Sequence, residues 1–238
     1  MQRGVKLFTE MKKEKTDFIE ENWFAPEKFY AKGFPKGIAP HLKDFPAIVK
    51  KLKELVRSGN FKNALEIGPG KQPVIKGVPN PVFLDASKFF LKGKAISRGE
   101  KILGRIEQLP FKDNSFDLVI ENDVLSNVLP KNRVKALNEM ARVSRGMILM
   151  FEYEIRDKMI GAWYPRDLKN PETIISLKEL KEELMPKAGI APLISYKYNS
   201  KAISKINKKG LLFNMELIFA IKGRQINQGY KQSNEGAV

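Results

Sequence analysis

One stretch of this chain, residues 61–70 (FKNALEIGPG), constrains the fold more than any other. An apolar run (ALEI) leads directly into Gly68 and Gly70, which are separated by a single proline. Glycines at this spacing let the backbone turn sharply after a strand and let a ligand approach the main chain closely. The stretch therefore predicts a buried strand whose carboxyl end meets a ligand.

A second acid-ended run and a third element follow at the spacing that such a ligand site needs. Asp85 ends an apolar run (VFL), about 20 residues further on, where an acid can accept hydrogen bonds from ribose hydroxyls. Residues 109–120 (LPFKDNSFDLVI) then combine a turn signal with another apolar strand. The polar residues after that strand are expected at the ligand edge of a parallel sheet.

Together these motifs resemble the class I S-adenosylmethionine-dependent methyltransferases, of the type 11 kind. ALEIGPG is similar to their first motif, VFLDAS to the acid after the second strand, and IEQLPFKDNSFDLVI to the segment that enters the fourth strand. LNEMARVSRGMILMFE is similar to the helix and fifth strand that follow, so the resemblance covers residues 61–152. It implies a Rossmann-like α/β fold, with a doubly wound, mostly parallel seven-stranded sheet that ends in an antiparallel strand pair.

The resemblance implies S-adenosyl-L-methionine as the cofactor, and it implies the residues that hold this cofactor. They are Glu66, Gly68, Pro69, Gly70, Asp85, Ala86, Ile106, Glu107, Glu121 and Asn122. In the family, the acid at the position of Glu66 faces the methionine part of the cofactor. Two positions depart from the family pattern, because Gln72 replaces a small residue and Arg105 replaces an adenine-contacting Asp. The main-chain N–H of Ile106 or Glu107 is then expected to serve the adenine ring, since backbone donors do not depend on residue type.

The predicted elements divide the chain into three parts. Residues 1–45 are predicted to form an accessory or lid segment, residues 46–223 the methyltransferase domain, and residues 224–238 a disordered tail. Within the domain, helices are predicted from residue 46 to the SGN at 58–60, at 131–144 and at 177–184, with a short one at 87–91. Strands are predicted at residues 64–67, 81–85, 102–106, 116–120, 147–151, 194–198 and 212–221.

Composition excludes several kinds of site. The chain has no cysteine and one histidine, His41, so thiolate chemistry is excluded and no metal site is predicted. No apolar run reaches the roughly 20 residues that a bilayer span requires, and the first 15 residues lack the apolar centre of a secretory signal. A cytoplasmic protein is expected.

The charge is strongly basic and unevenly distributed. The net charge is +16, and residues 185–238 hold nine basic and two acidic side chains. Such a field attracts polyanions such as RNA, but a lysine-rich surface typical of heat-adapted proteins explains it equally well. Both readings stay open.

The leading functional prediction is a methyltransferase that acts on a small-molecule acceptor. The residues after the fourth strand (ENDV) do not match the Asn/Asp-Pro-Pro-aromatic signature of amino-directed nucleic-acid methyltransferases. Aromatic side chains at Tyr30, Trp163 and Tyr164 are predicted to contact the substrate. The alternatives are an RNA methyltransferase that uses the basic C-terminal region and a catalytically silent relative that binds a partner.

No catalytic residue is predicted. Methyl transfer from a sulfonium needs a general base only when the acceptor must lose a proton first. The acids and the histidine that could serve have no spacing that singles one out: Glu121, Asp123, Glu152, Glu154 and His41.

Overall fold

The computed structural model describes residues 45–70, 73–125, 128–155, 175–203 and 210–223. The predicted lid segment (apart from Phe45) and the predicted tail lie outside these residues, as do Gln72 and the substrate candidates Tyr30, Trp163 and Tyr164. His41 lies outside them as well.

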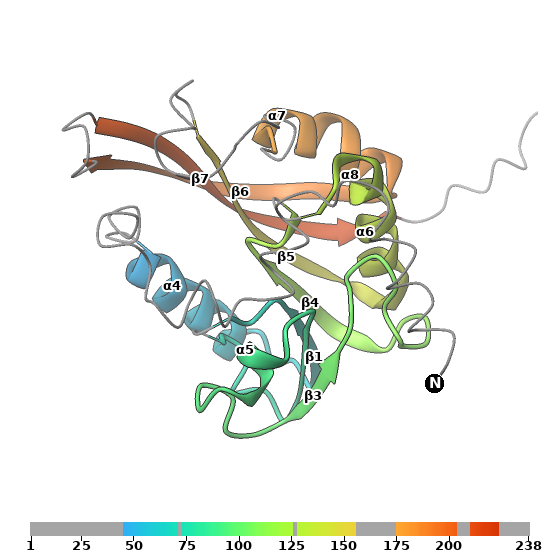
Figure 1. Cartoon of the computed structure of the whole chain (residues 1–238). Coiled ribbons are helices and arrows are strands. Elements are labelled where there is room, and N and C mark those ends of the chain that lie inside the picture. Colours follow the sequence, from blue (N-terminus) through green and yellow to red (C-terminus); the bar gives the residue numbers. More distant parts are fainter. Residues whose placement is uncertain (1–44, 71–72, 126–127, 156–174, 204–209, 224–238) are drawn as a thin grey trace, which may run out of the picture.

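A single seven-stranded sheet organises the chain, with strand order β3-β2-β1-β4-β5-β7-β6 (Figure 1). Strands β1 to β5 run parallel to one another, whereas β7 is antiparallel to both β5 and β6. The predicted fold class is therefore confirmed. The strands are β1 (Asn63–Ile67), β2 (Asn80–Asp85), β3 (Glu100–Leu103), β4 (Phe116–Asn122), β5 (Ser144–Ile155), β6 (Ile190–Ile203) and β7 (Gly210–Lys222).

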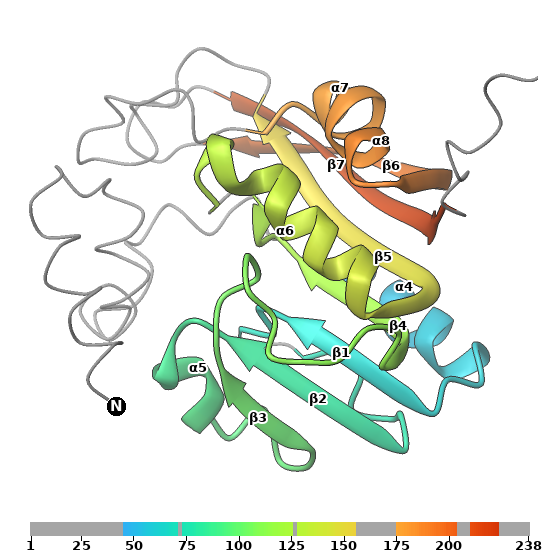
Figure 2. The same cartoon turned by 90° about the vertical axis from the view of Figure 1, so that its right-hand side faces the viewer.

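Helices cover both faces of the sheet and form two apolar cores. The helix α4 (Phe45–Ser58) lies on one face, and α6 (Pro130–Val143), α7 (Leu177–Glu179) and α8 (Met185–Lys187) lie on the other (Figures 1 and 2). Leu52 of α4 packs in the core between α4 and the sheet, and Leu137 of α6 packs in the core on the opposite face. Because both faces of the central strands are covered, these strands read as continuous apolar runs.

The connection from β1 to β2 contains no helix within its described residues, 73–79. Val74, Ile75 and Val78 of this loop are nonetheless buried, and they join the core on the α4 side. Loop side chains therefore cover the part of the sheet that a crossover helix ordinarily covers.

Two predicted elements differ from the observed ones. The third strand was expected at residues 102–106, but β3 ends at Leu103. The Gly104 N–H still donates to the Asp85 carbonyl at 3.0 Å, and the chain then turns at residues 105–108, where the Gln108 N–H donates to the Arg105 carbonyl at 3.1 Å. The helix expected at residues 177–184 is present, but it widens after α7 into a π-helical turn, η5 (Leu180–Leu184). The other predicted strands and helices are confirmed, with ends that differ by a few residues, and α5 (Lys88–Lys92) is the short helix expected before Gly93.

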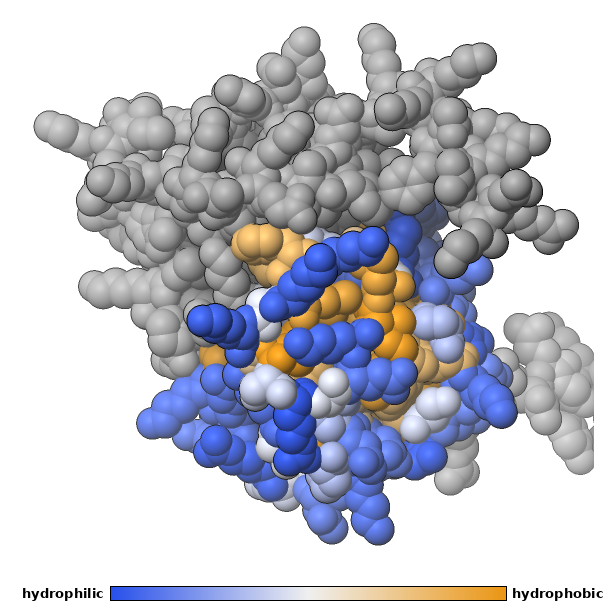
Figure 3. Space-filling view, turned by 60° about the horizontal axis from the view of Figure 1, so that its bottom comes forward, coloured by the Kyte–Doolittle hydropathy of each residue, from blue (hydrophilic) through white to orange (hydrophobic). Residues whose placement is uncertain are grey.

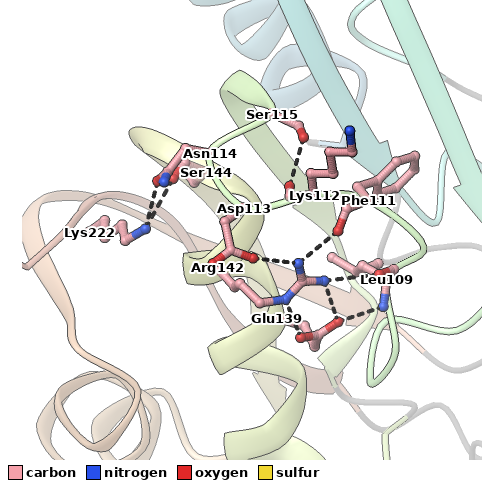
Figure 4. Close-up of polar contacts among 10 residues, drawn as sticks. All are labelled: Leu109, Phe111, Lys112, Asp113, Asn114, Ser115, Glu139, Arg142, Ser144 and Lys222. Carbon is pink, nitrogen blue, oxygen red and sulfur yellow. Dashed lines mark hydrogen bonds and ion pairs between the residues drawn. The ribbon is translucent and has the colours of Figure 1, made fainter.

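The amino end of β4 is held by an arginine of α6 (Figure 4). Arg142 donates to the carbonyl oxygens of Leu109 and Phe111 at 2.9 and 2.7 Å, and it forms ion pairs with Glu139 and Asp113. Glu139 in turn accepts a hydrogen bond from the Leu109 N–H at 2.7 Å. The loop that enters β4 is thereby fixed to α6.

On the coloured part of the face shown in Figure 3, hydrophilic side chains surround one central area where apolar side chains gather. Strand β6 is the outermost strand of the sheet, and it carries the exposed side chains of Leu193, Ile194 and Tyr196. Its pairing with β7 shifts register between Pro192 and Ile194. Among the described residues, no helix is long and apolar enough to cross a membrane.

Candidate active site

The turns that follow the parallel strands are tied to one another at the carboxyl edge of the sheet. The N–H of Gly68, after β1, donates to the Leu84 carbonyl at 2.8 Å, which links the β1 turn to β2. The N–H of Asp123, after β4, donates to the Phe151 carbonyl at 2.7 Å, which links the β4 turn to β5. With the Gly104 bond to β2 described above, these contacts make one continuous backbone edge.

The two glycines after β1 have the same backbone conformation and different surroundings. Gly68 and Gly70 have φ values of +65° and +51°, in the left-handed region that favours glycine. A Cβ at Gly68 would lie 2.3 Å from Cγ2 of Val124, whereas a Cβ at Gly70 would meet no atom of the described residues within 4 Å. Gly68 is therefore required by packing against the β4 turn, and Gly70 leaves the backbone open to an approaching ligand.

Asp85, at the end of β2, is joined to the glycine turn. Its carboxylate accepts hydrogen bonds from the N–H of Ser87 at 2.8 Å and from the N–H of Gly70. Ser87 also caps α5 by accepting a hydrogen bond from the Phe89 N–H. Burial raises the pKa of Asp85 to about 6, against the hydrogen bonds that lower it. The acid predicted to bind ribose thus lies directly beside the glycine turn.

Glu66 is fully buried, and strand alternation places it on the α4 face of the sheet. Its carboxylate accepts the N–H groups of Val74 at 2.8 Å and Ile75 at 3.2 Å, so it holds the loop that replaces the crossover helix. Burial raises the pKa of Glu66 to about 7 despite these bonds. A direct contact between Glu66 and the cofactor stays a prediction.

Two further carboxylates are buried on the opposite face, at the ends of β4 and β5. Glu121 Oε2 accepts the Val124 N–H at 2.9 Å, and Glu152 Oε1 accepts the Leu125 N–H at 2.7 Å. Burial raises the pKa of both carboxyls, and the nearby charge of Asp123 raises both further. The two acids hold the turn that contacts Gly68.

An ion pair lies in the segment that is predicted to meet adenine, residues 105–107. Arg105 Nη2 lies 2.9 Å from Glu107 Oε1, so the arginine that replaces the family acid is neutralised by the acid two residues later. The side chain of Ile106 is buried in the core on the α6 side. The predicted contacts of the Ile106 and Glu107 main chain with adenine remain predictions.

The structure gathers most of the predicted cofactor residues at one edge, and their chemistry fits S-adenosylmethionine. Gly70 offers open backbone, and Asn122 Oδ1 is a buried acceptor that receives no hydrogen bond from the described groups. An acceptor in that state suits a ligand that carries an ammonium group. Within the described ranges, no set of three His, Cys, Asp or Glu side chains has the geometry of a metal site.

Sequence reasoning missed two residues of this edge. Val124 packs on Gly68, but no sequence pattern identifies a residue that contacts a distant glycine. Arg133 of α6 is buried, and burial lowers the pKa of its guanidinium although the nearby charges of Glu152 and Glu179 act to raise it. A buried arginine on the apolar face of a helix is a signal that the helical pattern could have given.

Comparison with known sequences identifies the domain. Residues 65–149 match the family described as "Methyltransferase domain". An uncharacterised protein of Methanocaldococcus jannaschii is 35% identical over 104 residues, which cover 43% of this chain and 44% of that protein. A second uncharacterised protein of the same organism is 28% identical over 186 residues, which cover 75% of this chain and 87% of its own length.

Solved structures share the fold at low sequence identity. A putative methyltransferase from Bacillus halodurans superposes with a TM-score of 0.59 at 17% identity, over 75% of this chain and 100% of its own. Magnesium protoporphyrin IX methyltransferase from Synechocystis, solved with bound S-adenosylhomocysteine, superposes with a TM-score of 0.52 at 13% identity, over 74% and 83% of the two chains. The family match over residues 65–149, the strand order and the glycine turn agree, so this chain contains a methyltransferase domain with the Rossmann-like fold of the S-adenosylmethionine-dependent methyltransferases.

Proposed function

We propose that this enzyme binds S-adenosylmethionine along the carboxyl ends of β1, β2 and β4 and transfers its methyl group to a small-molecule acceptor. The observation that carries the cofactor site is the pairing of an open glycine with a buried acid. Gly70 has free space where a side chain would begin, and its N–H is bonded to Asp85. A left-handed glycine that meets no described side chain lets a ligand approach the backbone, and a buried acid beside it with a raised pKa is typical of a functional site.

The residues at this edge divide into groups by the part of the cofactor that they meet. The backbone of residues 68–70 contacts the cofactor, and Asp85 and Ala86 bind its ribose. The main chain of Ile106 and Glu107 meets the adenine ring. Glu121 and Asn122 lie at the methionine end, where the free Asn122 Oδ1 accepts from the ammonium group.

The local charge suits a cationic ligand although the whole chain is basic. Bound S-adenosylmethionine supplies an activated methyl group on a positively charged sulfur. The carboxyl ends of the strands present Asp85 and Asp123, in a chain whose net charge is +16. These acids favour binding of the cation, and the protein's main task is then to hold the acceptor in line and exclude water.

The acceptor is proposed to be a small molecule because the residues after β4 lack the signature of base-amine methyltransferases. Tyr30, Trp163 and Tyr164 are part of this proposal as substrate contacts. An RNA acceptor is the second candidate, favoured by the nine basic and two acidic side chains of residues 185–238. RNA binding through this region would weaken steeply with salt.

Calorimetric titration with S-adenosylhomocysteine, on protein freed of co-purified ligand, tests the cofactor site. Asp85→Asn should weaken binding by at least tenfold, which corresponds to about 1.4 kcal/mol. Asp117→Asn is the matched control, because Asp117 also accepts two backbone N–H groups but lies at the amino end of β4. Equal affinities for the wild type and Asp85→Asn would refute the assignment of the site, and no binding to the wild type would refute the cofactor.

The acceptor is then sought with S-adenosylmethionine that carries a labelled methyl group. Label transferred to a metabolite extract and not to total RNA would support the small-molecule proposal. Transfer to RNA that is lost when Lys201, Lys205, Lys208 and Lys209 are all replaced by glutamine would overturn it in favour of the RNA alternative.

A further inference from the structure

The buried acids Glu121 and Glu152 form a pair on one face of the sheet. In the pairing of β4 with β5, Glu121 is opposite Met150, so Glu152 is its diagonal neighbour two residues further along β5. Strand alternation places both side chains on the face covered by α6. Both residues are completely buried, and their side chains are within hydrogen-bonding reach of each other.

Each acid uses one oxygen on the β4 turn and leaves the other unsatisfied. Glu121 Oε2 and Glu152 Oε1 accept the N–H groups of consecutive residues, Val124 and Leu125. Glu121 Oε1 and Glu152 Oε2 receive no hydrogen bond from the described groups. Two ionised carboxylates cannot bond to each other, because neither carries a donor. A single proton would turn these two unsatisfied oxygens into a donor and an acceptor.

The surrounding charges leave the pair short of positive partners. Asp123 of the same turn adds a negative charge, and Glu179 of α7 lies near Arg133 of α6, whose charge acts on Glu152. Across the sheet, Glu152 is opposite Glu216 of β7, but that acid is paired with Lys181 of η5 at 2.7 Å and approached by Lys197 of β6 at 3.9 Å. Among the described residues, one arginine therefore acts on the two buried carboxyls, which favours retention of a proton.

We infer that Glu121 and Glu152 share one proton at neutral pH, and that this bridge is a positioning device for the cofactor site. The bridge holds residues 123–125, and Val124 of that turn presses on Gly68. Loss of the proton places two buried negative charges side by side, and the β4 turn then moves away from the glycine turn. The link to the cofactor rests on the proposed function, whereas the shared proton does not.

The shared proton is tested by the pH dependence of stability, without any ligand. The unfolded chain has both acids ionised above about pH 5, so each proton held by the folded state alone lowers the folded-to-unfolded ratio tenfold per pH unit. In Glu152→Gln, an amide N–H replaces the shared proton. Between pH 6 and 8, the free energy of unfolding of this variant should therefore fall less steeply with pH than that of the wild type, by the equivalent of about one proton. Glu216→Gln, the control on the same face, should keep the wild-type slope in this range.

The positioning role is tested by affinity for S-adenosylhomocysteine across the same pH range. The wild type should lose affinity as pH rises, Glu152→Gln should bind with no such loss, and Glu152→Leu should bind more weakly at every pH because it frees the Leu125 N–H. The protonated-carboxyl band in the infrared spectrum at pH 7 should be weaker in Glu152→Gln than in the wild type, and the part that remains should come from Glu66, whose pKa is about 7.

Several outcomes would overturn the inference. If the stability of Glu152→Gln depends on pH as steeply as that of the wild type, the shared proton is refuted. If Glu152→Leu binds S-adenosylhomocysteine with wild-type affinity, the positioning role is refuted. If Glu152→Leu does not fold, Glu121→Gln provides the second measurement, and a wild-type slope there counts against the pair. If the wild type binds no S-adenosylhomocysteine, the proposed cofactor site fails, while the stability slopes still decide the shared proton.

Discussion

The two ends of β4 use charged residues in opposite ways. At the amino end, Arg142 and Arg145 meet Glu139, Asp113 and Asp117 in ion pairs of 2.6–2.9 Å, and most of these side chains are partly exposed. At the carboxyl end, Glu121 and Glu152 are fully buried beside each other, and neither has an ion pair with a described lysine or arginine. The amino end is arranged for stability, whereas the carboxyl end keeps a costly arrangement that is characteristic of functional sites.

The largest expected difference between the two ends is in the response to pH. Glu66 and Asp85 have a pKa raised to about 7 and about 6, so the stability that each provides is complete below its unfolded pKa and is lost as pH rises through the folded pKa. Each should reduce the free energy of unfolding by about 3 kcal/mol between pH 4 and pH 8. Asp117 and Glu139 have a lowered pKa, so their contribution is instead lost as pH falls below about 4.

Urea denaturation at matched ionic strength, at pH 5, 6, 7 and 8, measures this effect. In Glu66→Gln, the free energy of unfolding should fall less steeply from pH 5 to pH 8, by the equivalent of about one proton. In Asp117→Asn, its fall with pH should match that of the wild type in this range. Stability that stays constant or rises from pH 5 to pH 8 would contradict the raised pKa values at the carboxyl end.

A smaller effect separates the two glycines of the β1 turn. Gly68→Ala should lose about 3 kcal/mol of stability, because it adds left-handed strain and a clash with Val124, a β-branched side chain on a hydrogen-bonded turn. Gly70→Ala has open space, so strain alone should cost it about 1 kcal/mol. Thermal unfolding gives the stabilities, and titration with S-adenosylhomocysteine should show that Gly70→Ala loses affinity out of proportion to its stability. Equal stability losses would mean that Val124 moves aside.

The smallest of the three effects concerns the arginine at the amino end. Arg142→Ala removes hydrogen bonds to two carbonyls and two acids, and it should lower the free energy of unfolding by about 2 kcal/mol. Arg142→Lys should recover about half of this loss, because an ammonium cannot reproduce the planar arrangement of donors. Both variants should bind S-adenosylhomocysteine like the wild type. Lost affinity in Arg142→Lys, with little loss of stability, would show that the two ends of β4 are coupled.

The central strands and the glycine turn could be predicted because their signals are local. β1, β2 and β4 are buried on both faces, so apolar runs mark them, and Gly68 and Asp85 stand at their ends. β3 was misplaced because it is an edge strand, and among its four residues only Ile102 is not exposed. The turn at residues 105–108, which ends the strand early, contains no glycine, proline or asparagine that would have signalled it.

The arrangement of the acids could not be predicted, because it depends on contacts between distant residues. Alternation along β1 gives the face of Glu66, but not that loop N–H groups at residues 74 and 75 would occupy its carboxylate. Glu121 and Glu152 were recognised separately as candidate bases. That they form a pair follows only from the register between β4 and β5, which one sequence does not reveal.

The outer strand β6 has a consequence for how the protein behaves at high concentration. A 14-residue edge strand with exposed apolar side chains is a template on which another chain can add its own strand. Pro192 lacks an N–H, the adjacent register shift bends the edge, and Lys197 adds a charge. Mutual repulsion of molecules with a net charge of +16 acts in the same direction. The basic surface, whatever it binds, thus also protects the enzyme from sheet-to-sheet aggregation.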